Sequence, residues 1–210
     1  MQVSTIYCVM IVYANISIKL GDIADISAGF PLRGSLESLP KGDAYFVSAK
    51  DLNGDYEISW HSVAKVSLPT KRQPRLLKNG NILFFARGSN THAFSVNNPP
   101  EKAVCGPQFF VITITDTNKI LPEFITWQIN QKPSQNYLKN HSYGSAMKNI
   151  SRSTLESLQI FLPDIEEQQT IVNFWKAAQK ERKLMTRLID NREKQLLAFA
   201  QKISNQNMDK

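Results

Sequence analysis

The loop at residues 87–92 carries a dense set of side chains that form directional hydrogen bonds. It contains Arg87, Ser89, Asn90 and Thr91 and directly follows the apolar run Ile-Leu-Phe-Phe-Ala. Arginine can donate two hydrogen bonds to a guanine edge, asparagine can pair with adenine, and Ser or Thr can bind phosphate. The loop therefore predicts contacts with a nucleic acid, and a plain surface hairpin fits these residues equally well.

A second segment, residues 71–75, is suited to phosphate binding by charge alone. It reads Lys-Arg-Gln-Pro-Arg and places Lys71, Arg72 and Arg75 within five residues. Cations that neutralise phosphates bind DNA of any sequence, because this attraction does not depend on the bases. We predict that the segment clamps a nucleic-acid backbone, with a solvated surface loop as the alternative.

The basic residues gather in two windows that contain no acids. Residues 58–100 hold six Lys or Arg and residues 124–155 hold four, with no Asp or Glu in either window, and the whole chain has a net charge of +7. A solvated surface normally intersperses both signs. The windows therefore favour a polyanionic partner, unless carboxylates from elsewhere in the fold lie beside them.

The sequence offers little for catalysis or metal binding. The three histidines are isolated from one another, and the two cysteines lie far apart with no CxxC spacing. Asn-Pro-Pro at residues 98–100 resembles an adenine methyltransferase signature, but Glu101 replaces the aromatic residue that would stack on a flipped base. We therefore predict a non-catalytic protein without metal or cofactor, and the cysteine usage favours a reducing cytoplasm.

These loops require a scaffold, and residues 18–163 predict a mixed α/β (α+β) domain with many short strands. Runs rich in β-branched and aromatic residues predict strands at residues 45–48, 56–60, 82–86, 93–96 and 109–115. Helical segments are predicted at residues 120–131 and 134–140, with a further turn at 153–158 capped by Ser151 or Ser153. Residues 1–17 contain an apolar run too short to span a membrane and predict a buried or edge strand.

From Asp164 the pattern becomes that of one long helix. Pro163 ends the preceding segment, Asp164 is placed to cap the helix, and Glu167 completes a capping box. Because no Gly or Pro follows, the helix should cover residues 164–204, a length of about 60 Å, before a tail at residues 205–210. Its apolar seam, in a 4-then-3 spacing, includes Ile171, Trp175, Ala178, Met185, Ile189, Leu196 and Phe199.

An exposed seam of this length is unstable, so we expect a partner helix in coiled-coil-like packing. The partner helix would come from a second copy of this chain or from another protein. The alternative is a helix that folds back over its own domain.

The order of elements around this helix resembles the specificity subunit of type I restriction-modification systems. A basic loop, a short strand, Leu162-Pro163, an acidic cap and Glu167-Gln168 precede the helix. The resemblance covers about residues 18–204, and it implies a target-recognition domain at 18–163 followed by a spacer helix at 164–204. It also implies that residues 143–150 lie near DNA. In that loop Ser145 and Lys148 would contact DNA, Lys148 through phosphate, and Asn149 would have a structural or base-contacting role.

The resemblance further implies a role without catalysis. Such a subunit directs a partner methyltransferase, and a restriction and translocase subunit, to a site in double-stranded DNA. Full specificity subunits carry two recognition domains, whereas this chain has room for one and contains no repeat. We therefore expect half of such a subunit, either a natural half that forms a homodimer through its helix or a truncated product.

Two other functions remain open from the sequence. In the first alternative, the chain is a non-DNA interaction module that assembles through its helix. In the second, it is a DNA-binding regulator or orphan fragment without a methylase partner. If the DNA reading is correct, Arg87, Asn90 and Lys148 should lie on loops on one side of the domain.

Overall fold

The computed structural model describes six stretches of the chain, and every structural statement below concerns them. They are residues 17–31, 42–52, 56–68, 74–88, 91–144 and 148–208. The chain divides into two compact units, Met1–Thr170 and Ile171–Lys210, and the second unit continues a helix that begins in the first. Each unit is considered by itself.

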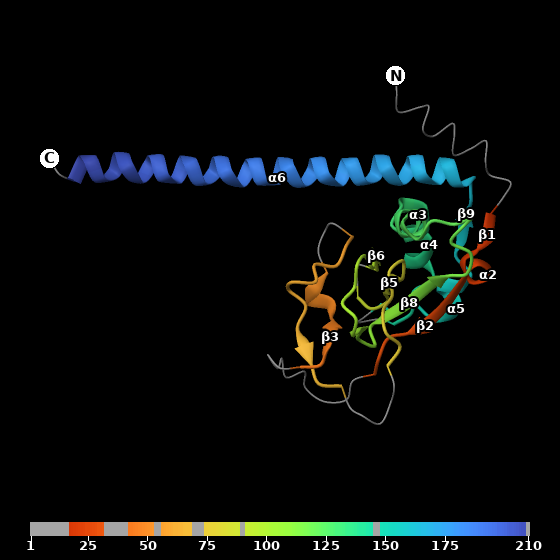
Figure 1. Ribbon diagram of the computed structural model, residues 1–210. Helices are drawn as coiled ribbons and strands as arrows, with labels where there is room; N and C mark the ends of the chain where they lie inside the picture. The colour runs from red at the N-terminus through yellow and green to blue at the C-terminus, as the bar shows by residue number, and fades with distance from the viewer. Residues whose placement is uncertain are drawn as a thin grey trace, which may run out of the picture. The chain divides into compact units, whose positions relative to one another are not determined.

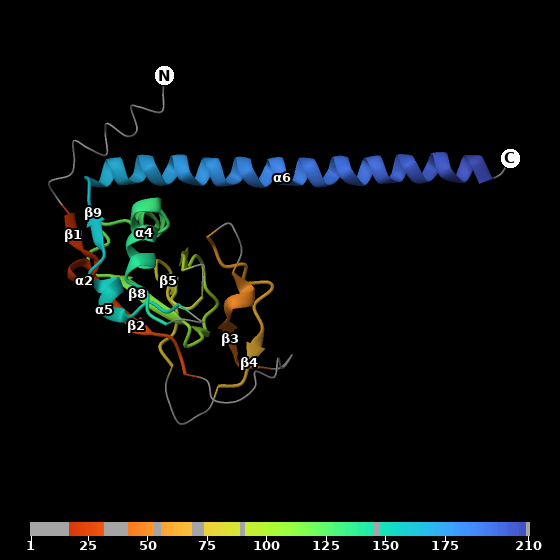
Figure 2. The same ribbon diagram turned by 180° about the vertical axis from the view of Figure 1, so that it is seen from behind.

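The first unit is built from short strands and helices, a mixed α/β fold of the class that the composition predicts (Figures 1 and 2). In chain order they are β1 (Ser17–Lys19), α2 (Leu20–Ile23), β2 (Ala24–Ala28), β3 (Ala44–Val47), the 3-10 helix η1 (Ala49–Asp51), β4 (Lys65–Val66), β5 (Ile82–Phe85), β6 (Ala93–Ser95), β7 (Ala103–Cys105), β8 (Phe109–Ile114), α3 (Pro122–Ile129), α4 (Lys132–Asn140), α5 (Arg152–Glu156) and β9 (Gln159–Phe161). The helix α6 covers Ile165–Met208.

The largest sheet has the order β2-β8-β5-β6 and is antiparallel throughout. Its centre is β8, because Ile112 pairs with Ile26 of β2 on one side and with Ile82 of β5 on the other. Helix α3 packs against β5 and β6. The apolar, β-branched and aromatic composition of β5 and β8 suits this central position, where strands are buried on both faces.

Two smaller sheets complete the first unit. Strand β3 lies between β4 and β7 in a three-stranded sheet, antiparallel to β4 and parallel to β7. Strands β1 and β9 form an antiparallel pair, with Ile18 opposite Ile160, so the beginning and the end of the domain lie side by side (Figures 1 and 2).

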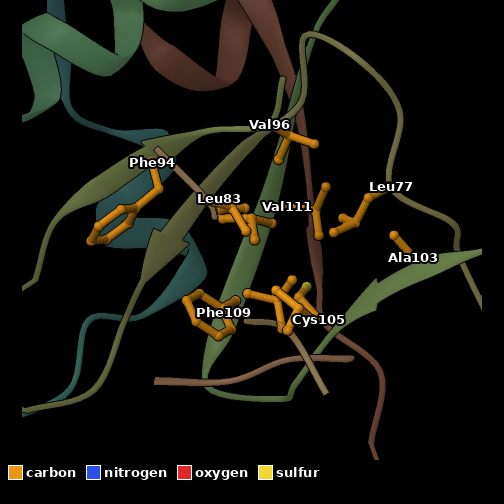
Figure 3. Close-up of a cluster of buried hydrophobic side chains, with 11 residues drawn as sticks. Leu77, Leu83, Phe94, Val96, Ala103, Cys105, Phe109 and Val111 are labelled. Atoms are coloured by element: carbon orange, nitrogen blue, oxygen red, sulfur yellow. The ribbon is translucent and has the colours of Figure 1, made fainter. Parts of the chain in front are cut away.

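The main hydrophobic core lies between the large sheet and the β4-β3-β7 sheet. Figure 3 shows Leu83, Phe109 and Val111 of the large sheet in the same cluster as Ala103 and Cys105 of β7. All five side chains are buried. Burial of apolar area at about 25 cal/mol per Å² makes this cluster the main contribution to holding the two sheets together.

Most of the predicted elements are present, with one exception among the strands. Residues 56–60 form only isolated bridges, in which Glu57 pairs with Ser95 and Ile58 pairs with Leu52. Tyr56 adopts a φ of 55°, a conformation typical of turns, and this interrupts the extended backbone that a strand requires. The β-branched and aromatic composition of the segment therefore serves the core, since Ile58 is buried.

The predicted helix ends are close to those observed. Helix α4 begins at Lys132, two residues before the predicted start, and α5 is capped by Ser151, whose Oγ accepts the Thr154 N–H at 3.0 Å. Asp164 caps α6, and its Oδ1 accepts the Glu167 N–H at 2.9 Å. Helix α6 extends to Met208, beyond the predicted end near residue 204. Within the described residues, no helix has the length and apolar character needed to cross a membrane.

Candidate nucleic-acid interface

Two loops that lie far apart in the sequence are joined by backbone pairing. Asn149 forms antiparallel bridges with both Arg87 and Tyr143. The Gly88 N–H donates to the Lys148 carbonyl at 2.8 Å, and Tyr143 and Asn149 exchange two N–H···O bonds of 3.0 and 2.8 Å. The loop after β5 and the loop after α4 are therefore held as one unit.

The large sheet anchors this pair of loops. The Ala86 N–H donates to the Gln108 carbonyl at 3.0 Å, and the Ile150 N–H donates to the Ala86 carbonyl at 2.9 Å. Gly88 has a φ of 99°, which residues with a side chain rarely adopt, so the chain can leave β5 in this direction only through glycine. Immediately after Ile150, the Ser151 cap starts α5 and fixes the other end.

A cavity of about 290 Å³ opens between the joined loops and the start of β8. Arg87, Tyr143 and Asn149 line it from the loops, and Pro107, Phe109 and Phe110 line it from the β7–β8 connection and β8. The lining combines flat apolar rings with an arginine and an amide. Such a combination can bind a planar ligand that has a polar edge.

The joined loops expose positive charge. Arg87 and Lys148 are both exposed. Ion pairs join Arg75 to Asp25, Lys119 to Asp116 and Arg152 to Glu156, and neither Arg87 nor Lys148 takes part in them. An unneutralised cation on an exposed loop is available to a phosphate or to a base edge. Arg87 and Lys148 lie on the two joined loops, and Asn90, the third residue expected on the same side of the domain, lies outside the described residues.

Arg75 differs from Arg87 and Lys148 because its guanidinium is already engaged. Its Nη1 donates to Asp25 at 2.9 Å and to Ser27 at 2.8 Å, and its Nη2 donates to Thr113 at 3.3 Å. These bonds attach the 74–78 segment to the surface of β2 and β8. In the basic window at residues 58–100, a carboxylate from elsewhere in the fold, Asp25, therefore does lie beside Arg75, as the alternative explanation of that window expected.

The remaining predicted contact residues have different outcomes. Five of them, Lys71, Arg72, Ser89, Asn90 and Ser145, lie outside the described residues. Thr91, predicted as a surface contact, is instead buried with 8% exposed, because the chain re-enters the sheet just before β6. Asn149 is half-buried and lines the cavity.

Tyr143 is the residue that sequence reasoning missed. Its side chain is 59% exposed, whereas most large aromatic side chains of the described residues are at least half-buried. The available signal was an aromatic residue directly before a glycine in a basic loop. In protein–DNA and protein–RNA complexes, exposed aromatic rings contact bases.

In the second unit, an apolar stripe runs along the exposed helix. Of the predicted seam, Ile171 and Trp175 are half-buried, whereas Ala178, Met185, Ile189, Leu196 and Phe199 are exposed. Leu184, Leu188 and Leu197 widen the stripe and are also exposed. Arg192, which interrupts the seam, donates to Gln195 of the same helix at 3.0 Å. The stripe is an exposed apolar surface of the kind that marks an interaction site.

A family profile described as the type I restriction modification DNA specificity domain matches residues 16–192. The type I restriction enzyme MjaIX specificity subunit of Methanocaldococcus jannaschii is 26% identical over 157 residues, which is 73% of this chain and 35% of that protein. This chain therefore spans about a third of the length of this curated relative.

Solved structures share the fold. The S subunit of a type I restriction-modification system from M. genitalium matches with a TM-score of 0.51 at 20% identity, covering 76% of this chain and 37% of that one. The HsdS subunit from Thermoanaerobacter tengcongensis matches with a TM-score of 0.57 at 18% identity, covering 82% and 39%. A third structure, solved in work on the complex assembly and conformational transition of the type I R-M system, matches with a TM-score of 0.58 at 19% sequence identity. The match covers 82% of this chain and 40% of that one.

Proposed function

The chain belongs to the family of type I restriction-modification DNA specificity domains, and from this premise we propose that it recognises a specific sequence in double-stranded DNA. The match of the family profile to residues 16–192 carries the proposal. The joined loops around Asn149, with exposed Arg87 and Lys148, support it because they offer unpaired cations beside groups that can read bases.

The roles of the loop residues follow from their chemistry. Lys148 contacts phosphate, and Arg87 and Asn149 contact base edges, where a guanidinium matches guanine and an amide matches adenine. Lys71 and Arg72 add phosphate contacts that are independent of sequence. Arg75 contributes less because Asp25 already neutralises it at 2.9 Å. Ser89, Asn90 and Ser145 belong to the same proposed surface.

The chain acts without catalysis and without a cofactor in this proposal. It directs a partner adenine methyltransferase, and a restriction and translocase subunit, to the bound site. The curated relative is named as a specificity subunit of a type I restriction enzyme, which supports this division of labour. Among the described residues, no group of three or more His, Cys, Asp or Glu side chains is placed to hold a metal ion.

The exposed stripe of α6 is covered by a second α6 in the proposed assembly. Met185 and Ile189 are 54% and 59% exposed, and burying such side chains contributes about 1.5–3 kcal/mol each. A two-fold pair of identical chains would place two identical recognition domains on the duplex. Symmetry then predicts a target of two inverted halves separated by a gap that the helices set.

Two measurements test the proposed function. Fluorescence anisotropy of the full chain with a random duplex library, followed by selection and sequencing of the bound DNA, should yield an enriched sequence. Co-expression with a type I adenine methyltransferase subunit should then place methyl groups at that sequence in the genome of the expression host. Failure to enrich any sequence, together with methylation that does not depend on this chain, would contradict the proposal.

The exposed stripe also favours a second candidate, an interaction module that acts only through its helix. Under this alternative the chain associates through α6 but has no affinity for duplex DNA. Light scattering together with the anisotropy titration separates the two functions, because self-association without DNA binding would favour the module.

A further inference from the structure

The cavity between the two joined loops combines flat rings with a polar edge. Phe110 and Pro107 supply apolar surface from β8 and the turn before it, and Tyr143 supplies an aromatic ring from the loop. Arg87 and Asn149 contribute a guanidinium and an amide to the same lining. A volume of about 290 Å³ is at the lower end of the range for small-molecule pockets, roughly 300–1,000 Å³, which suits one planar group.

The position of Tyr143 is not explained by folding. Its side chain is 59% exposed, although exposing a large aromatic ring forgoes the stabilisation that burial provides. The two hydrogen bonds between Tyr143 and Asn149, which close the loop, are made by backbone atoms and not by the ring of Tyr143. The backbone bonds therefore fix the position of Tyr143 in the loop, while its side chain stays exposed to a ligand.

A nucleobase matches this lining. Each base has a flat face that stacks on aromatic rings and an edge that carries donors and acceptors. Guanidinium and amide groups form paired hydrogen bonds with purine edges. The backbone places both residues at the cavity, because Arg87 and Asn149 face each other in a backbone bridge.

We propose that this cavity binds a single nucleobase of the DNA target, with Tyr143 against its face and Arg87 and Asn149 at its edge. This inference rests on the proposed function. It assigns Tyr143 as a residue that determines specificity, and it places the three residues at one position of the target. Lys148, on the same loop, contacts phosphate and affects all sequences alike.

The test compares the sequence preferences of four proteins. Full-length wild type, Tyr143→Ala, Asn149→Ala and Lys148→Ala are each used to select duplexes from a random library, and circular dichroism confirms folding. Tyr143→Ala and Asn149→Ala should relax the preference at the same position of the target and weaken binding to the wild-type sequence about tenfold or more. Lys148→Ala should weaken binding without changing the preference at any position. Tyr143→Phe, which keeps the ring, should retain the wild-type preference.

Fluorescence of 2-aminopurine, placed at the assigned position of the target, then shows whether the bound base is displaced from the duplex or stays stacked in it. A rise in fluorescence on binding shows a base displaced from the stack, as the placement of Tyr143 against its face requires. An unchanged signal shows a base that stays stacked in the duplex, and the nucleobase proposal is then wrong.

The outcomes separate this inference from the proposed function. If wild type selects a sequence and Tyr143→Ala selects the same sequence with equal affinity, the nucleobase proposal is wrong and DNA recognition stands. If Tyr143→Ala and Asn149→Ala weaken all duplexes equally, the residues act on the backbone and the nucleobase proposal is again wrong. If wild type selects no sequence, both proposals are wrong.

Discussion

The Gln168 side-chain oxygen accepts a hydrogen bond from the Leu121 backbone N–H at 2.9 Å. Gln168 is completely buried, and its amide nitrogen donates to the Lys119 carbonyl at 2.9 Å and to the Pro163 carbonyl at 2.8 Å. One side chain therefore joins the first turn of α6 to the segment that precedes α3. All of these residues belong to the first unit.

We expect Gln168→Leu to destabilise the domain by about 1–3 kcal/mol, because the Leu121 N–H and two carbonyls would be left buried without a partner. Urea unfolding followed by circular dichroism measures the change in the free energy of unfolding. Gln201→Leu makes the same chemical change at an exposed helical position and should alter stability by less than about 0.5 kcal/mol. Equal stabilities for the two variants would show that the Gln168 bonds contribute nothing.

Charge reversal of Lys71, Arg72 and Arg75 together should weaken binding to duplexes of every sequence and flatten the salt dependence. Each lost phosphate contact should reduce the slope of log K against log salt by about 0.9. Arg75→Gln alone should change the slope little, since its charge is already paired with Asp25. Lys119→Gln, at a cation paired with Asp116, is the control. An unchanged slope in the triple variant would place the DNA surface elsewhere.

Replacement of Met185 and Ile189 by Asp should convert dimers to monomers in light scattering and abolish sequence-specific methylation. Two charges in an apolar interface cannot be solvated there, so association should weaken by more than a hundredfold, while weak non-specific DNA binding remains. Arg187→Asp, an exposed position off the seam, should leave the dimer intact. A wild-type chain that stays monomeric at tens of micromolar would contradict the helix pairing.

Burial raises the pKa of the Cys105 thiol from its ordinary value of 9.0 to about 12. The unfolded chain therefore loses this proton at a lower pH than the folded chain. The contribution of the thiol to the free energy of unfolding is fully present below pH 9 and is lost as the pH rises from 9 towards 12. In a Cys8→Ser background, a thiol reagent at pH 8 should label Cys105 only at the rate of unfolding. Rapid labelling of the folded protein would show that the thiol is accessible.

The sequence predicted the elements whose local pattern is strong. Strands β5 and β8 are long apolar runs rich in β-branched and aromatic residues, and α6 follows a proline and an acidic cap with no later breaker. Strands β1, β4 and β7 have two or three residues each, too few to show a periodicity. Their pairing depends on partners far along the chain, as between β1 and β9.

The candidate site was expected in part from the sequence. The composition of the first loop indicated Arg87, and the family resemblance indicated Lys148 in the second loop. The bonds from Arg75 to Asp25 and Thr113 were not foreseeable, because these residues become neighbours only when β2 and β8 pair. Thr91 is buried because the polar loop ends closer to β6 than its composition indicated.

The hydrogen bonds from Gly88 to Lys148 and between Tyr143 and Asn149 use main-chain atoms, and this has a consequence for the evolution of the protein. Side chains at positions 87, 143, 148 and 149 can change while the bonds between Gly88, Lys148, Tyr143 and Asn149 persist. Gly88 and Gly144 are restricted, by φ values of 99° and 97°. We therefore expect a change of target to require few substitutions and to leave the stability of the domain nearly unaltered, so that new specificities can arise without passing through unfolded intermediates.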